Sequence, residues 1–198
     1  VEEKPYRSRP QAPFRTSTLQ QEGGRKLRLS SSQVMRVAQG LYERGYITYM
    51  RTDSVTLSNE ALGAVRAAIT SEYGSQFLSP QPKQYVSKVK NAQEAHEAGR
   101  PTTPLRPPRA VQRELNSQEL ALYRLIWQRT LASQMADATG TTVTVRLGAI
   151  AADGSDATFQ AAGTTITFPG YRQVYVESHD DDDAGDEREA LLPPLAEG

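Results

Sequence analysis

Apolar residues recur at every third or fourth position in three stretches of the chain, and this spacing predicts three amphipathic helices. They cover about residues 31–44, 59–73 and 117–137. The first of them is expected to bury one stripe, made of Val34, Val37, Ala38 and Leu41.

Residues that start and stop helices flank the first two of these stretches. Ser30 is an N-cap with Gln33 three residues later as its capping-box partner, and Gly45 follows the last turn. Ser58 caps the second helix, and Gly74 ends it after Tyr73. The pattern therefore fixes both helices at both ends.

After residue 140 the pattern changes to short runs of β-branched and aromatic residues separated by glycine and proline. We expect four strands, over Thr141–Leu147, Ala157–Ala161, Thr164–Phe168 and Tyr171–Val176. Short turns between them favour antiparallel pairing, so the sheet is expected to be small and antiparallel.

These elements predict an α+β chain in three parts. Residues 1–12 are rich in Pro, Arg and Gln and are expected to be a flexible lead-in. Residues 13–108 should form a mainly helical domain, in which a helix followed by an extended run resembles a winged-helix layout. Residues 109–198 should add a helix, the antiparallel strands and an acidic loop over 179–189. A solvated loop explains that acidic run better than a metal site does.

Composition excludes several classes of site. The chain has 198 residues, no cysteine and two histidines, so neither disulfides, thiolate metal sites nor a His-based zinc site are expected. No apolar run approaches the roughly 20 residues of a membrane span, which leads us to expect a cytoplasmic protein. The net charge is zero, but residues 1–100 hold 15 of the 23 basic and 9 of the 23 acidic residues. A basic first part suits a nucleic-acid backbone, although ordinary solvated charge explains it about equally well.

The chemistry centres on a β-type run, Tyr46 to Met50, that breaks into a turn-forming stretch at Thr52. In an extended segment Tyr49 and Arg51 project from the same face. A guanidinium can hold a phosphate with its planar fork, and a nearby cation favours the phenolate form of a tyrosine. The pair suits attack on a phosphodiester. On spacing alone, however, a half-buried packing tyrosine is the commoner case.

The longer string from Gly45 to Ser54, GYITYMRTDS, resembles the active-site signature of bacterial type IA DNA topoisomerases. Two further segments match that family in the same order: Pro13 to Gln21, PFRTSTLQQ, and Gln93 to Ala98, QEAHEA. Where the family usually has Ile-Arg-Pro after the last segment, this chain has Gly99-Arg100-Pro101. In that family the strands belong to an arch that joins the tyrosine domain to the rest of a ring.

The resemblance implies roles for particular residues. Tyr49 would be the nucleophile that forms a 5′-phosphotyrosine, Arg51 would hold the scissile phosphate, and His96 would assist by hydrogen bonding. Contacts with DNA, or local geometry around them, are implied for Arg51, Asp53, Ser54, Thr18 and Arg100. From the residues alone, the Thr16-Ser17-Thr18 cluster is interpreted as a helix cap or as a phosphate-contacting loop.

The same resemblance implies the partners. The substrate would be single-stranded and negatively supercoiled DNA, handled in the cytoplasm at the bacterial nucleoid. The complete enzyme would use Mg²⁺ and no ATP, with the metal held by a domain of the same enzyme that precedes this sequence. This chain itself is expected to bind no metal and, alone, to relax no DNA. No membrane partner is expected.

Two alternatives remain open from sequence. In the first, the chain is a winged-helix-like DNA-binding module in which Tyr49 and Arg51 only contact phosphate. In the second, it uses tyrosine recombinase or type IB chemistry. That chemistry would place the nucleophile late in the chain, after several catalytic arginines, whereas Tyr49 comes early beside a single arginine.

Overall fold

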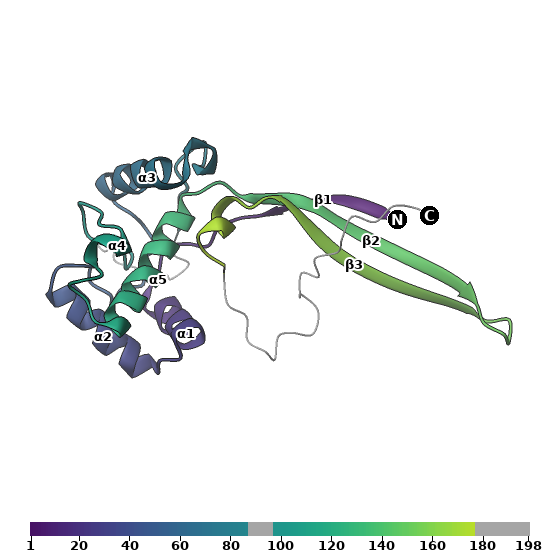
Figure 1. Cartoon of the computed structure of the whole chain (residues 1–198), viewed down its shortest axis with the longest axis horizontal. Coiled ribbons are helices and arrows are strands. Elements are labelled where there is room, and N and C mark those ends of the chain that lie inside the picture. Colours follow the sequence, from purple (N-terminus) through teal and green to yellow (C-terminus); the bar gives the residue numbers. More distant parts are fainter. Residues whose placement is uncertain (87–96, 177–198) are drawn as a thin grey trace.

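Helices gather at one end of the molecule, and a long β ribbon projects from them (Figure 1). The computed structural model describes residues 1–86 and 97–176. In chain order its elements are β1 (Glu2–Ser8), α1 (Thr16–Leu27), α2 (Ser31–Glu43), α3 (Asn59–Tyr73), η1 (Ser75–Phe77), α4 (Pro108–Val111), α5 (Ser117–Ser133), β2 (Ala138–Ile150), β3 (Asp156–Phe168) and η2 (Gly170–Gln173). We call the α1–α5 part the helical head and the three strands the ribbon. The α+β class predicted from sequence is confirmed.

The caps predicted for the first two helices are present. In α2 the Ser30 backbone N–H donates to the Gln33 side chain over 2.8 Å, and the Gln33 N–H donates back to Ser30 Oγ over 3.2 Å. In α3 the Ser58 hydroxyl accepts from the Ala61 N–H over 3.2 Å. Gly74 ends α3 with a positive φ of 98°, a conformation that glycine adopts at little cost. Local signals therefore determine both helices.

The third predicted helix is shorter than expected, because α5 ends at Ser133 and not at Asp137. Backbone groups beyond Ser133 bond to the segment after α3: the Ser79 N–H donates to the Gln134 carbonyl, and the Ala136 N–H donates to the Phe77 carbonyl over 2.8 Å. Long-range pairing thus replaces the last helical turn. The sequence pattern could not reveal it.

The core of the helical head is built around α5. Leu122 and Ile126 belong to a cluster with α1, α2 and the Tyr49 segment, while Trp127 and Leu131 pack against α3. The helix that we expected to open the second part of the chain therefore lies inside the core of the first. A division at residue 108 would cut through this core.

Close packing of α1 against α2 depends on one glycine. A Cβ built on Gly23 would lie 2.6 Å from Val34 Cγ2, which no real side chain tolerates. Val34 itself is fully buried. The two helices can approach this closely only because residue 23 has no side chain.

Residues Glu2–Ser8 form strand β1, so the prediction of a flexible lead-in over residues 1–12 is wrong for this part. They pair antiparallel with β2, from Glu2 opposite Thr144 to Ser8 opposite Ala138. The strand order is β1-β2-β3, which makes β1 an edge, where Pro5 is tolerated. The stabilisation comes from backbone pairing and not from buried side chains, which is why composition did not reveal it.

The remaining strands also differ from the prediction. β3 is one continuous strand through Gly163, and residues 170–173 form the 3-10 helix η2 where a strand was expected. Gly170 has a positive φ of 50°, and a Cβ there would lie 2.3 Å from the Asp137 carbonyl oxygen. This close approach turns the chain back onto the head.

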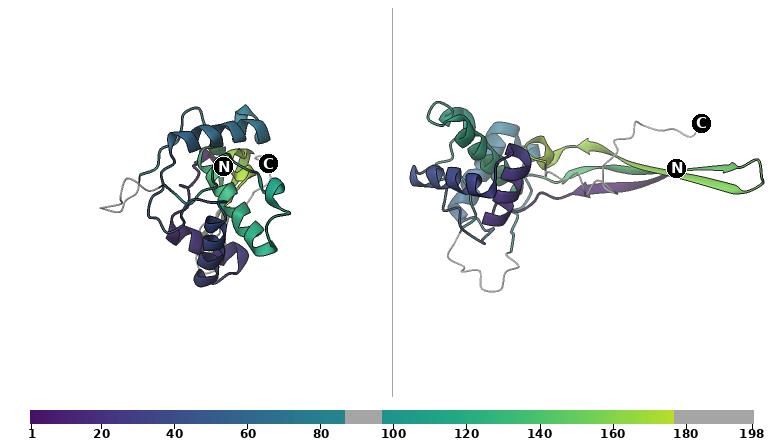
Figure 2. Two further views of the ribbon diagram at one scale, coloured as in Figure 1. Left: turned by 90° about the vertical axis from the view of Figure 1, so that its left-hand side faces the viewer. Right: turned by 90° about the horizontal axis from the view of Figure 1, so that it is seen from below.

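The ribbon is uneven along its length (Figure 2). β1 covers β2 only as far as Thr144, while β2 and β3 continue together to Ile150 and Asp156. Beyond β1 the hairpin carries exposed apolar side chains, namely Leu147, Ile150 and Phe159. None of the helices in the described ranges has both the length and the apolar character that a membrane crossing requires.

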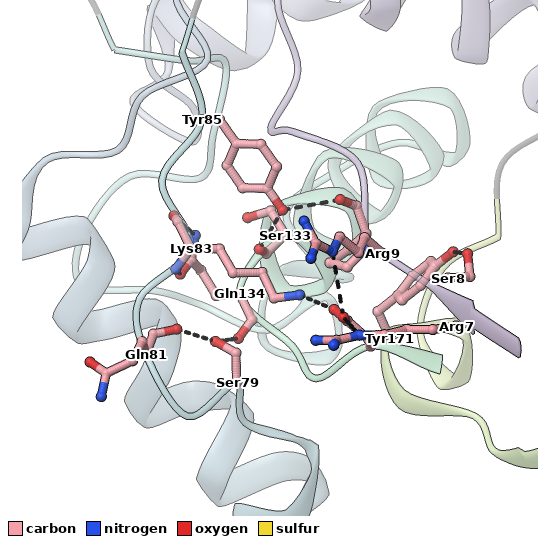
Figure 3. Close-up of polar contacts among 12 residues, drawn as sticks. Arg7, Ser8, Arg9, Ser79, Gln81, Lys83, Tyr85, Ser133, Gln134 and Tyr171 are labelled. Carbon is pink, nitrogen blue, oxygen red and sulfur yellow. Dashed lines mark hydrogen bonds and ion pairs between the residues drawn. The ribbon is translucent and has the colours of Figure 1, made fainter. Parts of the chain in front are cut away.

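A buried carboxylate joins the ribbon to the head. Asp137 is 9% exposed and accepts from Arg7 Nε over 2.5 Å and from Lys83 Nζ, with Arg9 Nε 3.9 Å away. The three basic residues come from β1, the segment after it and the loop after η1 (Figure 3). Burial raises the pKa of Asp137, but the bonds from Lys83 and Arg7 outweigh it and hold that pKa below its usual value.

Asp137→Asn is expected to lower the free energy of unfolding by about 2 kcal/mol at pH 7, because it leaves two basic groups without their charged partner. A carboxyl whose pKa falls on folding stabilises the folded chain above its unfolded pKa of about 3.9, and that contribution is lost as the pH falls through the lower folded value. Urea unfolding at several pH values should therefore show that the difference in the free energy of unfolding between wild type and variant becomes smaller in acid.

The control is Asp156→Asn, which removes an exposed carboxylate from the same sheet. It is expected to change stability by less than about 0.5 kcal/mol. An Asp137→Asn variant as stable as this control would contradict the role of Asp137.

Candidate active site

Tyr49 lies on a segment that two other stretches of the chain hold from either side. On one side the Thr16 N–H donates to the Thr52 carbonyl over 2.9 Å. On the other the Thr48 N–H donates to the Arg100 carbonyl over 2.8 Å, and the Thr102 N–H to the Tyr46 carbonyl over 3.0 Å. Because Thr48 Oγ1 and Thr52 Oγ1 also donate to the carbonyls of Ala98 and Glu97, residues from all three segments that the sequence singled out meet here.

The two outer stretches also touch each other. The Gly99 N–H donates to the Phe14 carbonyl over 2.8 Å. A Cβ at Gly99 would meet that carbonyl at 3.5 Å, an ordinary contact distance, so the glycine that departs from the family pattern is not required by crowding here.

We call the two stretches around Thr16 and Arg100, which hold the Tyr46–Thr52 segment between them, the clamp. Threonine side chains add hydrogen bonds to it. Thr48 Oγ1 donates to the Ala98 carbonyl over 2.8 Å and accepts from the Arg100 N–H over 3.0 Å. Thr52 Oγ1 donates to the Glu97 carbonyl over 3.0 Å. The predicted β run therefore does not become a regular strand: an isolated bridge joins Ile47 to Pro101, and side-chain bonds complete the pairing.

Buried residues lie on both sides of the tyrosine along this segment. Ile47 and Met50 are each 1% exposed and belong to the core, whereas Tyr49 is 43% exposed. Its ring meets the edge of Tyr42 from α2, with centroids 5.2 Å apart. Tyr49 is thus presented at the surface of the head by neighbours that are fixed inside it.

The nearby Tyr46 has a different environment. Its hydroxyl donates to Glu114 Oε2 over 2.6 Å, and its ring packs on Tyr123. The hydrogen bond to Glu114 raises the pKa of Tyr46, with burial adding to the effect, and so keeps this phenol protonated. No hydrogen bond to the Tyr49 hydroxyl is made by the described residues. Of the two tyrosines in the segment, Tyr49 is the one available for chemistry.

Arg51 is exposed and borders an open groove of about 590 Å³ along α2. The groove is lined by Gln20, Ser31, Ser32, Met35, Arg36, Gln39, Gly40, Glu43 and Arg51. No ion pair to a carboxylate engages Arg36 or Arg51 within the described parts of the chain. Two guanidiniums without a carboxylate partner at the edge of a groove are well placed to bind the phosphates of a nucleic-acid backbone.

The residues after Arg51 support the loop. Ser54 is buried, its N–H donates to Thr52 Oγ1 over 3.0 Å, and its hydroxyl lies 2.8 Å from Thr56 Oγ1. Asp53 is exposed. Ser54 is thus placed to hold local geometry, and Asp53 is placed to face solvent or a ligand.

Thr18 is occupied as a helix cap. Its hydroxyl accepts from the Arg15 N–H over 3.2 Å and lies 3.1 Å from the Arg15 carbonyl, at the start of α1. Of the two interpretations left open for the hydroxyl cluster, this geometry matches the cap.

Arg100 is buried and paired inside the protein. It is 7% exposed, Nη2 lies 2.5 Å from Glu97 Oε2, and Nη1 donates to the Pro101 carbonyl over 2.9 Å. Glu97 also accepts from the Ser58 N–H over 2.6 Å. Burial raises the pKa of Glu97, but the bonds from Arg100 and Ser58 outweigh it and lower that pKa. His96, the other residue implied in this region, lies outside the described residues.

The stretch that carries Phe14 is anchored from behind by a buried arginine. Arg129 Nε donates to the Ala12 carbonyl over 2.6 Å, and its guanidinium lies 4.8 Å from the Phe14 ring centroid. Tyr175 joins Arg129 to buried Glu22, since its hydroxyl accepts from Arg129 and donates to Glu22 over 2.7 Å. This network fixes one side of the clamp to α1 and α5.

Comparison with known proteins agrees with this geometry. The sequence model of a family described as DNA topoisomerase matches residues 1–198. The chain belongs to the bacterial type IA DNA topoisomerase family. It is 56% identical to DNA topoisomerase 1 of Streptomyces coelicolor over 200 residues, covering 100% of this chain and 21% of that protein. It is also 56% identical to DNA topoisomerase 1 of Synechocystis over 200 residues, a match that covers 100% of this chain and 22% of that protein.

Solved structures agree with the sequence comparison. Full-length topoisomerase I from Thermotoga maritima superposes with a TM-score of 0.74 at 34% identity, covering 100% of this chain and 31% of that one. The present chain spans about a fifth of the length of the curated relatives that it matches. Among its described residues no three His, Cys, Asp or Glu side chains gather as a metal ion would require.

Arg100→Gln is expected to lower the free energy of unfolding by about 2 kcal/mol, because it breaks a largely buried ion pair. The matched variant Arg51→Gln, at an exposed arginine, should leave stability within about 0.5 kcal/mol. Urea unfolding of the chain measures both. Equal losses of stability in the two variants would contradict the buried role of Arg100.

The same pair of variants separates structure from DNA binding. An arginine that neutralises one phosphate of a single strand adds about 0.7 to the slope of log affinity against log salt concentration. We expect the slope to fall by that amount in Arg51→Gln and to stay unchanged in Arg100→Gln, measured by fluorescence anisotropy with a labelled single-stranded oligonucleotide. A reduced slope for Arg100→Gln would show that this residue binds DNA directly.

Proposed function

We propose that this chain supplies the nucleophile of a type IA DNA topoisomerase and that Tyr49 is that nucleophile. The observation that carries the proposal is the exposed Tyr49 on a segment clamped to Thr16 and Arg100. A reactive group held by rigid neighbours is already close to its attacking geometry, which can contribute several kcal/mol to the barrier reduction.

The reaction is a transfer between two phosphate esters. The Tyr49 phenol loses its proton and its oxygen bonds to a backbone phosphorus of single-stranded DNA. The bond from phosphorus to the 3′ oxygen breaks, and that oxygen takes up a proton to become a 3′-hydroxyl, so that no net proton is gained or lost. The strand is left as a 5′-phosphotyrosine. Because one ester replaces another, the reverse step reseals the strand without ATP.

Arg51 is the phosphate-holding residue in this proposal. Its guanidinium is exposed at the α2 groove and has a planar fork suited to phosphate oxygens. Charge developing on those oxygens in the transition state would be offset there. Ser54 keeps the following loop in shape, and Asp53 is exposed beside it. His96, which the sequence resemblance implies as a hydrogen-bonding assistant, stays a prediction.

The wider reaction needs more than this chain. Negatively supercoiled DNA offers the single-stranded stretch, and the work would take place in the cytoplasm at the nucleoid. The family resemblance implies that magnesium would be held by another domain of the complete enzyme.

The decisive test is a chimera in which this chain replaces the matching 200 residues of the Streptomyces coelicolor relative. The chimera should form protein-linked DNA on a denaturing gel with a single-stranded oligonucleotide and magnesium. Tyr49→Phe should abolish the adduct while leaving oligonucleotide affinity within about twofold, because only the attacking oxygen is removed. Arg51→Gln should slow cleavage about 100-fold.

Tyr73→Phe is the matched control, since this tyrosine packs on Phe77 far along α3. It should cleave like wild type. An adduct that survives Tyr49→Phe would refute the assignment, and a chimera that binds DNA but forms no adduct would favour the DNA-binding module without chemistry.

The chain by itself should relax no supercoiled plasmid in magnesium, because it spans about a fifth of the length of the relatives that carry the name DNA topoisomerase 1. Agarose electrophoresis of plasmid incubated with the purified chain tests this. Relaxation that disappears in Tyr49→Phe would show that the chain holds a complete active site.

A further inference from the structure

One hydroxyl bridges the two peptide groups on either side of Arg51. Thr16 Oγ1 donates to the Met50 carbonyl over 2.8 Å and accepts from the Thr52 N–H, also over 2.8 Å. Thr16 thus bonds to the residue before Arg51 and to the residue after it.

The backbone of Thr16 adds a third bond in the same place. Its N–H donates to the Thr52 carbonyl over 2.9 Å. The hydroxyl also lies 3.1 Å from that carbonyl, but its distance to the Met50 carbonyl, 2.8 Å, is shorter. Among small side chains, only serine and threonine can donate and accept from a single atom in this way. Valine has the same shape and can do neither.

Thr16 is itself held firmly. It is the first residue of α1, the first turn is capped by Thr18, and α1 packs on α2 through the close contact of Gly23 with Val34. The groove that Arg51 borders lies mainly along α2. The hydroxyl of Thr16 therefore ties the Tyr49–Arg51 segment to the two helices next to that groove.

We propose that Thr16 is a positioning residue for strand cleavage. Its hydroxyl fixes the backbone of Arg51, so that the guanidinium holds the phosphate while Tyr49 attacks the phosphorus. Thr16 need not touch the DNA itself. The inference rests on the function proposed above for Tyr49 and Arg51.

The test uses Thr16→Val and Thr16→Ser in the same chimera, with cleavage followed in a single turnover. Thr16→Val should slow adduct formation about 10- to 100-fold, because small displacements of reacting groups have effects of that size. Oligonucleotide affinity should stay within about twofold. Thr16→Ser, which keeps both bonds, should recover at least about a third of the wild-type rate.

Thr130→Val is the matched control for a purely structural effect. It removes a buried hydroxyl from α5, together with its bond to the Ile126 carbonyl, but none that reaches Arg51. Melting temperatures of both valine variants should fall, while only Thr16→Val slows cleavage. Thr16→Val at the wild-type rate, or equal slowing by Thr130→Val, would overturn the proposal.

Failure of the underlying function would look different. A wild-type chimera that forms no adduct, or an adduct that survives Tyr49→Phe, would remove the nucleophile and the role of Thr16 together. A wild-type adduct that depends on Tyr49 but is unaffected by Thr16→Val would reject the role of Thr16 alone.

Discussion

The hydrogen bonding of the Tyr46–Thr52 segment is the constraint on which the rest of the site depends. This segment is half buried and belongs to no sheet, so its backbone groups need partners that ordinary secondary structure would have supplied. Two remote stretches provide them, around Thr16 and around Arg100. Because an unpaired buried N–H or carbonyl costs about 1–3 kcal/mol, the three stretches form as one unit.

Charged residues inside the helical head and charged residues at the groove have different surroundings. Buried charged groups such as Asp137, Arg100 and Arg129 have partners at hydrogen-bonding distance, which offsets the cost of removing them from water. Arg36 and Arg51 border the open groove without a carboxylate partner in the described parts of the chain. Paired charges therefore hold the structure, and these two arginines are available to an anionic ligand.

Local signals made part of this fold predictable. Helices α2 and α3 were predicted correctly from the caps at Ser30 and Ser58 and from the glycine after each helix. The hydrogen bonds of these caps join residues that lie within four positions of each other, so the local sequence encodes them. The segments of the candidate site were predicted from the three family motifs, because the order and spacing of these motifs along the chain are specific. Strand β1, the end of α5 and the role of Thr16 were missed. Each of these depends on pairing between residues more than thirty positions apart, which neither periodicity nor composition encodes.

The location of the clamp has a mechanical consequence. Its bonds all lie within the helical head, whereas the ribbon meets the head at the junction around Asp137 (Figure 3). Three chain segments link the head to the ribbon, next to Arg9, next to Gln134 and at Gly170, and all three pass close to Asp137. Rotation of the head relative to the ribbon would therefore strain that junction. The hydrogen bonds that hold the Tyr46–Thr52 segment, to Thr16, Ala98 and Arg100, lie away from this junction. In the reaction proposed above, Tyr49 stays attached to a cut strand and must keep its geometry while the parts around it move, so support that is separate from the junction favours that role.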